Sequence, residues 1–132
     1  MKKITVALVI TKPGHLRNGL QSLLRTVPQI EIIAEAQDTS VLLKMSDELH
    51  PELILLDASI FEESSWNAIS KFKAEWPQTV ILVLTENDQQ GLKAKGAGAD
   101  LFIPKGFPAA KLVDLIENSL SRNMRDEIKK SH

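Results

Sequence analysis

Apolar residues along the chain alternate between two periods. One is the continuous apolar run, which is typical of a strand buried on both faces of a sheet. Such runs occur at residues 4–10, 30–36, 53–56, 79–84 and 101–103. The run at 30–36 is interrupted by Glu31 and Glu35, which favours an edge position for that strand.

The other period is helical, with apolar residues recurring on one helix face between the strands. The stripes are Leu16, Leu20, Leu23, Leu24 and Val27; Leu42, Met45 and Leu49; Trp66, Ile69, Phe72 and Trp76; and Leu112, Leu115, Ile116 and Leu120. Residues 89–95 form a fifth, short and weakly apolar helix. Pro28, Pro51 and Pro77 end helices, whereas Pro108 suits a first helical position.

Five strands that alternate with five helices predict an α/β fold. Right-handed crossovers place the strands in a parallel sheet with helices on both faces. We expect one domain over residues 1–121, followed by a polar tail or linker over residues 122–132.

Composition agrees with a single soluble domain. The chain has 132 residues, of which 43% are hydrophobic and 25% charged, and it has no cysteine. Disulfides and thiolate zinc sites are therefore excluded. The longest apolar runs, at residues 6–10 and 80–84, are far shorter than a bilayer-spanning segment, so we expect a cytoplasmic protein with no membrane contact.

Charge is unevenly distributed behind a net charge of −1. No acidic residue precedes Glu31, and the first 30 residues contain five basic ones: Lys2, Lys3, Lys12, Arg17 and Arg25. The lysines at positions 2 and 3 precede a buried strand, and we expect Arg17 and Arg25 on the solvent side of a helix. Neither the net charge nor the distribution of basic residues therefore favours direct binding of nucleic acid.

Chemistry in a parallel sheet concentrates where the strands end. Asp57, Thr85 and Lys105 each follow a different predicted strand. Together they suit phosphoryl chemistry, with a carboxylate as nucleophile and a hydroxyl and an ammonium group to hold oxygens. Taken singly, each more often has a plainer role: an aspartate after a strand caps a loop or helix, Thr85 is a strand-end hydroxyl and Lys105 is a solvated charge.

Several short motifs occur in order along the chain. They are Arg17-Asn18-Gly19-Leu20, Ile32-Ile33-Ala34-Glu35-Ala36, His50-Pro51-Glu52-Leu53-Ile54-Leu55-Leu56-Asp57, Val83-Leu84-Thr85, Gly98-Ala99-Asp100 and Ile103-Pro104-Lys105. With them the chain resembles, from about residue 4 to residue 120, the receiver domain of two-component response regulators, nearest to the NarL type.

The resemblance implies a flavodoxin/CheY-like fold with strand order 2-1-3-4-5. It also implies that Asp57 is the phospho-acceptor, Thr85 the switch hydroxyl, Lys105 the phosphoryl-contacting lysine and Phe102 the aromatic switch residue.

One departure from the family concerns the metal. Receivers carry an acidic pair after the first strand that binds Mg²⁺ with the acceptor aspartate, and Thr11 and Lys12 stand at those positions. Because Mg²⁺ prefers carboxylate oxygens, we expect no metal and no other cofactor. Our hypothesis is that Lys12 replaces the charge of the metal and that Lys12 and Lys105 both lie near an ionised Asp57.

Two functions follow. The first is a degenerate or metal-independent receiver that acts as a protein-interaction switch and is not an enzyme. The alternative is a conventional receiver that a histidine kinase phosphorylates on Asp57. The expected partners are a histidine kinase or another signalling protein, a DNA-binding output domain outside this chain, and a second copy of the chain as a homodimer.

Overall fold

The computed structural model describes residues 5–44 and 50–130, and for residues 122–130 it gives the helical backbone. Its elements are β1 (Thr5–Ile10), α1 (His15–Arg25), β2 (Ile30–Ala36), α2 (Val41–Lys44), β3 (Leu53–Asp57), the 3₁₀ turn η1 (Ala58–Ile60), α3 (Glu63–Glu75), β4 (Val80–Thr85), α4 (Asp88–Ala97), β5 (Leu101–Pro104) and α5 (Ala109–Lys130). Each predicted strand and helix is present. Met45 and Leu49, predicted for the second helix, lie outside the described residues.

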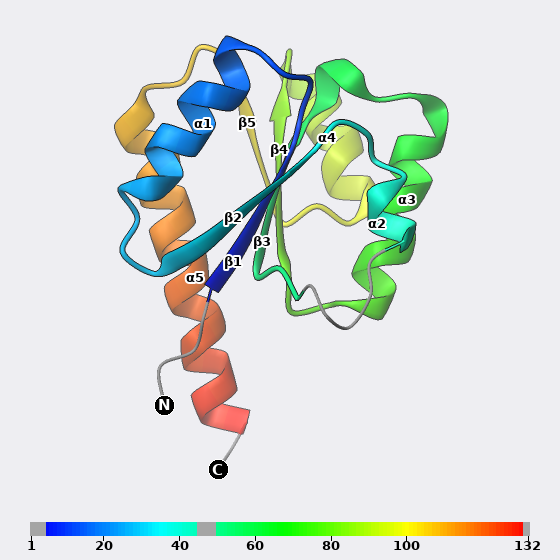
Figure 1. Cartoon of the computed structure of the whole chain (residues 1–132). Coiled ribbons are helices and arrows are strands. Elements are labelled where there is room, and N and C mark those ends of the chain that lie inside the picture. Colours follow the sequence, from blue (N-terminus) through cyan, green and yellow to red (C-terminus); the bar gives the residue numbers. More distant parts are fainter. Residues whose placement is uncertain (1–4, 45–49, 131–132) are drawn as a thin grey trace.

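The five strands form one parallel sheet in the order β2-β1-β3-β4-β5. The predicted fold class and the strand order implied by the resemblance are therefore confirmed. β2 is at an edge, as its two glutamates indicated. In Figure 1, β2 and β1 lie beside β3, with β4 and β5 beyond them.

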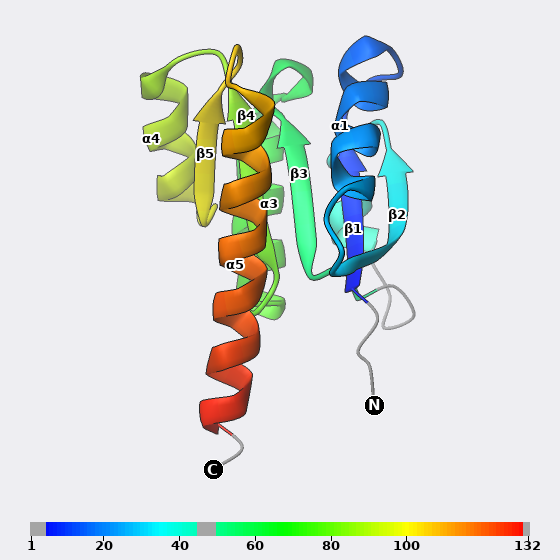
Figure 2. The same cartoon turned by 90° about the vertical axis from the view of Figure 1, so that its left-hand side faces the viewer.

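Alternate strand residues divide the core between the two faces of the sheet. Ala7 and Val9 of β1 pack with α1 and α5, whereas Leu8 and Ile10 pack with α2, α3 and α4. Figure 2 shows α1 and α5 in front of the sheet and α3 behind it. The period-two exchange of faces is why the sequence shows continuous apolar runs in the strands.

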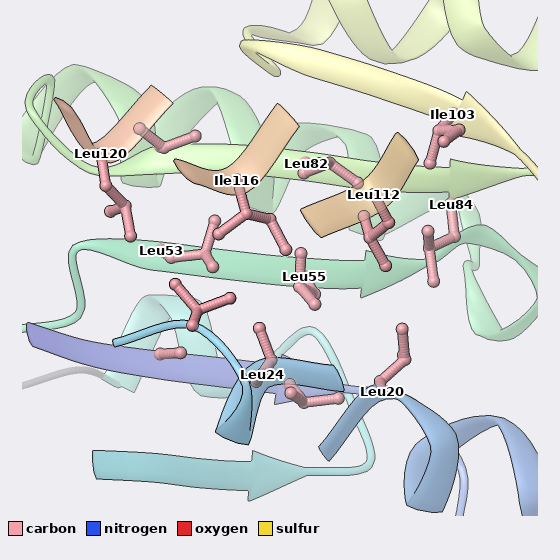
Figure 3. Packing of buried hydrophobic residues seen from close by; sticks show 14 residues of the cluster. Leu20, Leu24, Leu53, Leu55, Leu82, Leu84, Ile103, Leu112, Ile116 and Leu120 are labelled. Carbon is pink, nitrogen blue, oxygen red and sulfur yellow. The ribbon is translucent and has the colours of Figure 1, made fainter. Parts of the chain in front are cut away.

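Leucine and isoleucine side chains close the α1/α5 face of the sheet. Leu24 of α1 and Ile116 of α5 project onto Leu53 and Leu55 of β3 (Figure 3). All four are at most 1% exposed. Burial of each such side chain stabilises the fold by about 1.5–3 kcal/mol relative to exposure. This packing holds α1 and α5 against the central strands, and with them the loops that surround the strand ends.

The last helix is longer than predicted. α5 continues to Lys130, so it crosses residue 121, where we placed the end of the domain. Figures 1 and 2 show it extending past the sheet. After Leu120 the apolar stripe continues at helical spacing with Met124 and Ile128, and the arginines, lysines and glutamate between them have high helix propensity. None of the described helices combines the length and apolar character needed to span a membrane.

Candidate functional site

The ends of four neighbouring strands, β1, β3, β4 and β5, bring Thr11, Asp57, Thr85 and Lys105 together. Ile10 of β1 is paired with Leu56 of β3, so the next residues, Thr11 and Asp57, come side by side. Thr85 ends β4, and its carbonyl accepts a hydrogen bond of 2.7 Å from the N–H of Lys105 after β5. A cavity of about 470 Å³ opens beside Asp57, and Thr11, Ser59 and Lys105 are among its lining residues.

Asp57 is buried, at 2% exposure, and both of its carboxylate oxygens are engaged. Oδ2 accepts a hydrogen bond of 2.8 Å from the hydroxyl of Thr11. Oδ1 lies 2.9 Å from Nζ of Lys105 and accepts a 2.9 Å hydrogen bond from the N–H of Ser59. Burial alone would raise the pKa of Asp57, but these hydrogen bonds from Lys105, Ser59 and Thr11 outweigh it and hold the pKa below its ordinary value. The carboxylate is therefore ionised at neutral pH.

Lys105 is shared between two carboxylates. Its Nζ lies 2.9 Å from Oδ1 of Asp57 and also 2.9 Å from Oε1 of Glu86. Burial would lower the pKa of Lys105, and the contacts with the two acids raise it above its ordinary value. Glu86 was not among the predicted site residues. Its place directly after Thr85, at the same strand end, was the signal that could have found it.

Arg17 is buried, at 8% exposure, and the prediction that it faces solvent is wrong. Its guanidinium donates to the carbonyl of Thr11 and, over 2.8 Å, to the carbonyl of Ala36. It also forms an ion pair of 3.2 Å with Glu35. Arginine is usually exposed, but acceptors from β1 and β2 offset the cost of burying this one. Arg25, by contrast, is exposed as predicted.

Comparison with known proteins decides the family. The model of the response regulator receiver domain matches residues 7–117. The chain belongs to this receiver family. It is 32% identical over 120 residues to the transcriptional regulatory protein YdfI of Bacillus subtilis (strain 168), covering 88% of this chain and 56% of that protein. It is 29% identical over 106 residues to the response regulator protein VraR of Staphylococcus aureus, covering 79% of this chain and 51% of VraR. The receiver thus spans about half the length of these relatives.

Solved structures show the same fold. A putative response regulator from Chloroflexus aurantiacus superposes with a TM-score of 0.77 at 18% identity, covering 90% of the receiver and 99% of that chain. A LuxR family DNA-binding response regulator from Silicibacter pomeroyi gives a TM-score of 0.74 at 23% identity, covering 89% of the receiver and 93% of that chain.

The residues beside Asp57 in this receiver do not fit a magnesium site. Asp57 is the one carboxylate among the residues that line the cavity, and the acidic-pair positions hold Thr11 and Lys12. Both oxygens of Asp57 already accept hydrogen bonds from the protein. Mg²⁺ binds through hard oxygen ligands with near-octahedral geometry, and a threonine hydroxyl and a lysine ammonium do not replace two carboxylates.

Lys12 does not take the position that we expected in this receiver. It lines the cavity, but its side chain is exposed, and among the described residues the ion-pair partner of Asp57 is Lys105. The N–H of Thr11 still bonds to Ala36, and the chain leaves the sheet after it. Thr11, the last residue of the ladder, is thus placed against Asp57, and Lys12 is not.

The two predicted switch residues lie on neighbouring strands. The hydroxyl of Thr85 is fully buried and has no hydrogen-bond partner among the described residues. Phe102 is half-buried on β5, and its ring lies against Gly91 of α4. Their switch roles stay predictions from the family resemblance.

Proposed function

We propose that this receiver domain of two-component signal transduction is degenerate, in that it acts as a protein-interaction switch without Mg²⁺-dependent phosphorylation. The observation that carries the proposal is the engagement of both Asp57 oxygens by groups of the protein itself. Thr11 donates to Oδ2, and Lys105 and Ser59 occupy Oδ1. A phosphoryl group would have to displace the Thr11 hydroxyl or compete with the other two donors. The transfer would also lack the divalent cation that neutralises developing negative charge.

The alternative is a conventional phospho-acceptor domain. The observation in its favour is that Asp57, Thr85 and Lys105 all lie at adjacent strand ends, with the ammonium of Lys105 in contact with Asp57. On this reading a histidine kinase supplies the phosphoryl group to Asp57.

Incubation with acetyl phosphate and Mg²⁺, followed by intact mass spectrometry, separates the two. We expect the protein to remain unmodified. An adduct of one phosphoryl group that is absent from Asp57→Asn would establish the conventional function. The double substitution Thr11→Asp and Lys12→Asp restores the acidic pair and is the positive control, which we expect to be labelled.

We further propose the setting in which this receiver works. As a non-enzymatic module in the cytoplasm, it would receive its signal from a histidine kinase or another signalling protein. It would pass the signal to a DNA-binding output domain or to a second copy of itself. The output domain is supported by the relatives, one of which is named a transcriptional regulatory protein and another a DNA-binding response regulator. Size-exclusion chromatography with light scattering tests the homodimer.

A further inference from the structure

Arg17 joins three elements at the end of the sheet where Asp57 lies. Its Nη2 donates to the carbonyl of Thr11, after β1, and to the carbonyl of Ala36, the last residue of β2. Its Nη1 lies 3.2 Å from the Glu35 carboxylate. Because a buried cation is costly without such partners, the guanidinium is confined to the place where these three acceptors meet.

Thr11 stands between Arg17 and Asp57. Its N–H donates to Ala36 over 3.1 Å, and its carbonyl accepts from Arg17, so both of its backbone polar groups are held. Its side chain is buried, and the hydroxyl donates to Oδ2 of Asp57 over 2.8 Å. A continuous chain of contacts therefore runs from Glu35, on the edge strand, to Asp57 at the centre.

We propose that Arg17 is a positioning residue, which holds the backbone of Thr11 so that the threonine hydroxyl lies on Asp57. The edge strand β2 is thereby tied to the phospho-acceptor position. This inference deepens the proposed function and rests on it for its biological meaning. The Thr11 hydroxyl keeps one oxygen of Asp57 hydrogen-bonded. At the other end of the chain of contacts lies Glu35, whose side chain is 43% exposed and can be reached by a partner protein.

Arg17→Lys is the sharpest substitution, because lysine keeps the charge but has a single nitrogen in place of the planar fork that reaches three acceptors. Arg25→Lys is the matched control, since Arg25 lies on the same helix and is exposed. Thr11→Val removes the hydroxyl of Thr11 and nearly keeps its shape.

The experiment is NMR of the full chain at neutral pH, with two readouts: the carboxyl ¹³C resonance of Asp57 and the exchange rate of the Thr11 hydroxyl proton. In Arg17→Lys we expect a displaced Asp57 resonance and hydroxyl exchange faster by on the order of tenfold, as local opening becomes easier. Arg25→Lys should give wild-type values. Wild-type values in Arg17→Lys would overturn the proposal.

A double-mutant cycle shows whether Arg17 acts through Thr11. If it does, adding Arg17→Lys to Thr11→Val displaces the Asp57 resonance no further than Thr11→Val alone, whereas additive displacements would refute the mechanism.

If Arg17→Lys does not fold, Glu35→Gln takes its place. It should displace the same resonance in the same direction by less, and an unmoved resonance would overturn the proposal. These NMR measurements use no phosphodonor. Labelling of the wild-type protein by acetyl phosphate would therefore overturn only the proposed function.

Discussion

Gly91 of α4 lies against the ring of Phe102 in β5 so closely that a methyl group on the glycine would sit 2.2 Å from two ring carbons. The glycine backbone is not in the left-handed region, so the ring and not the turn of the chain accounts for the missing side chain. A glycine inside a helix costs about 1 kcal/mol relative to alanine. This contact offsets that cost by letting α4 approach β5.

Gly91→Ala is expected to lower the free energy of unfolding by about 1–2 kcal/mol, because the gain in helix propensity is smaller than the cost of displacing the ring. Gly96→Ala is the matched control in the same helix, since nothing lies within 4 Å of the added methyl. It should raise the free energy of unfolding by about 0.5–1 kcal/mol. Urea denaturation measures both, and a stabilising Gly91→Ala would contradict the packing argument.

The free energy of unfolding is expected to fall at low pH because Asp57 becomes protonated. Its pKa in the folded protein is below the ordinary value of 3.8, so the folded state is stabilised above that value. The stabilisation is lost as the pH falls from about 3.8 through the lower folded pKa. Urea denaturation between pH 6 and pH 2 should show a smaller loss for Asp57→Asn than for the wild type. Equal losses would mean that the ionised carboxylate does not contribute.

Removal of the Lys105 ammonium should lower the free energy of unfolding more than neutralisation of Glu86, the second carboxylate that Lys105 contacts. Lys105→Met leaves the Asp57 charge buried with only the Thr11 and Ser59 donors, and we expect a loss of about 2 kcal/mol. Glu86→Gln, at a side chain that is 52% exposed, should cost less than about 1 kcal/mol. Thermal or urea unfolding compares the two variants, and a larger loss in Glu86→Gln would show that the outer pair dominates.

Magnesium binding is expected to be absent from the wild-type protein and present in a variant with the acidic pair. Calorimetric titration with Mg²⁺ should give no saturable heat for the wild type and a single site for the double variant Thr11→Asp and Lys12→Asp. The physical reason is the supply of carboxylate ligands next to Asp57. Saturable binding by the wild type would refute this, and NaCl at equal ionic strength controls for unspecific charge effects.

Much of the fold could be predicted because the spacing of apolar residues and the order of strands and helices can be read from short stretches of the chain. The continuous run at residues 53–56, for example, needed no knowledge of its neighbours to be recognised as a buried strand, and the glutamates of β2 indicated the edge. The positions of Asp57, Thr85 and Lys105 at strand ends followed from the same pattern. The full length of α5 was not predicted, although Met124 and Ile128 continue the four-residue spacing of Ile116 and Leu120, because most of the residues around them are polar.

The sequence by itself determined the alternating architecture, the strand ends that carry chemistry and the absence of an acid before Glu31. Only the tertiary structure decided which neighbour contacts Asp57. The pairing of β1 with β3 places Thr11 there, and a buried Arg17 holds it, while Lys12 lies in solvent. Such contacts depend on the register of strands far apart in the chain and on the burial of a charge, and neither is written in the local pattern of residues.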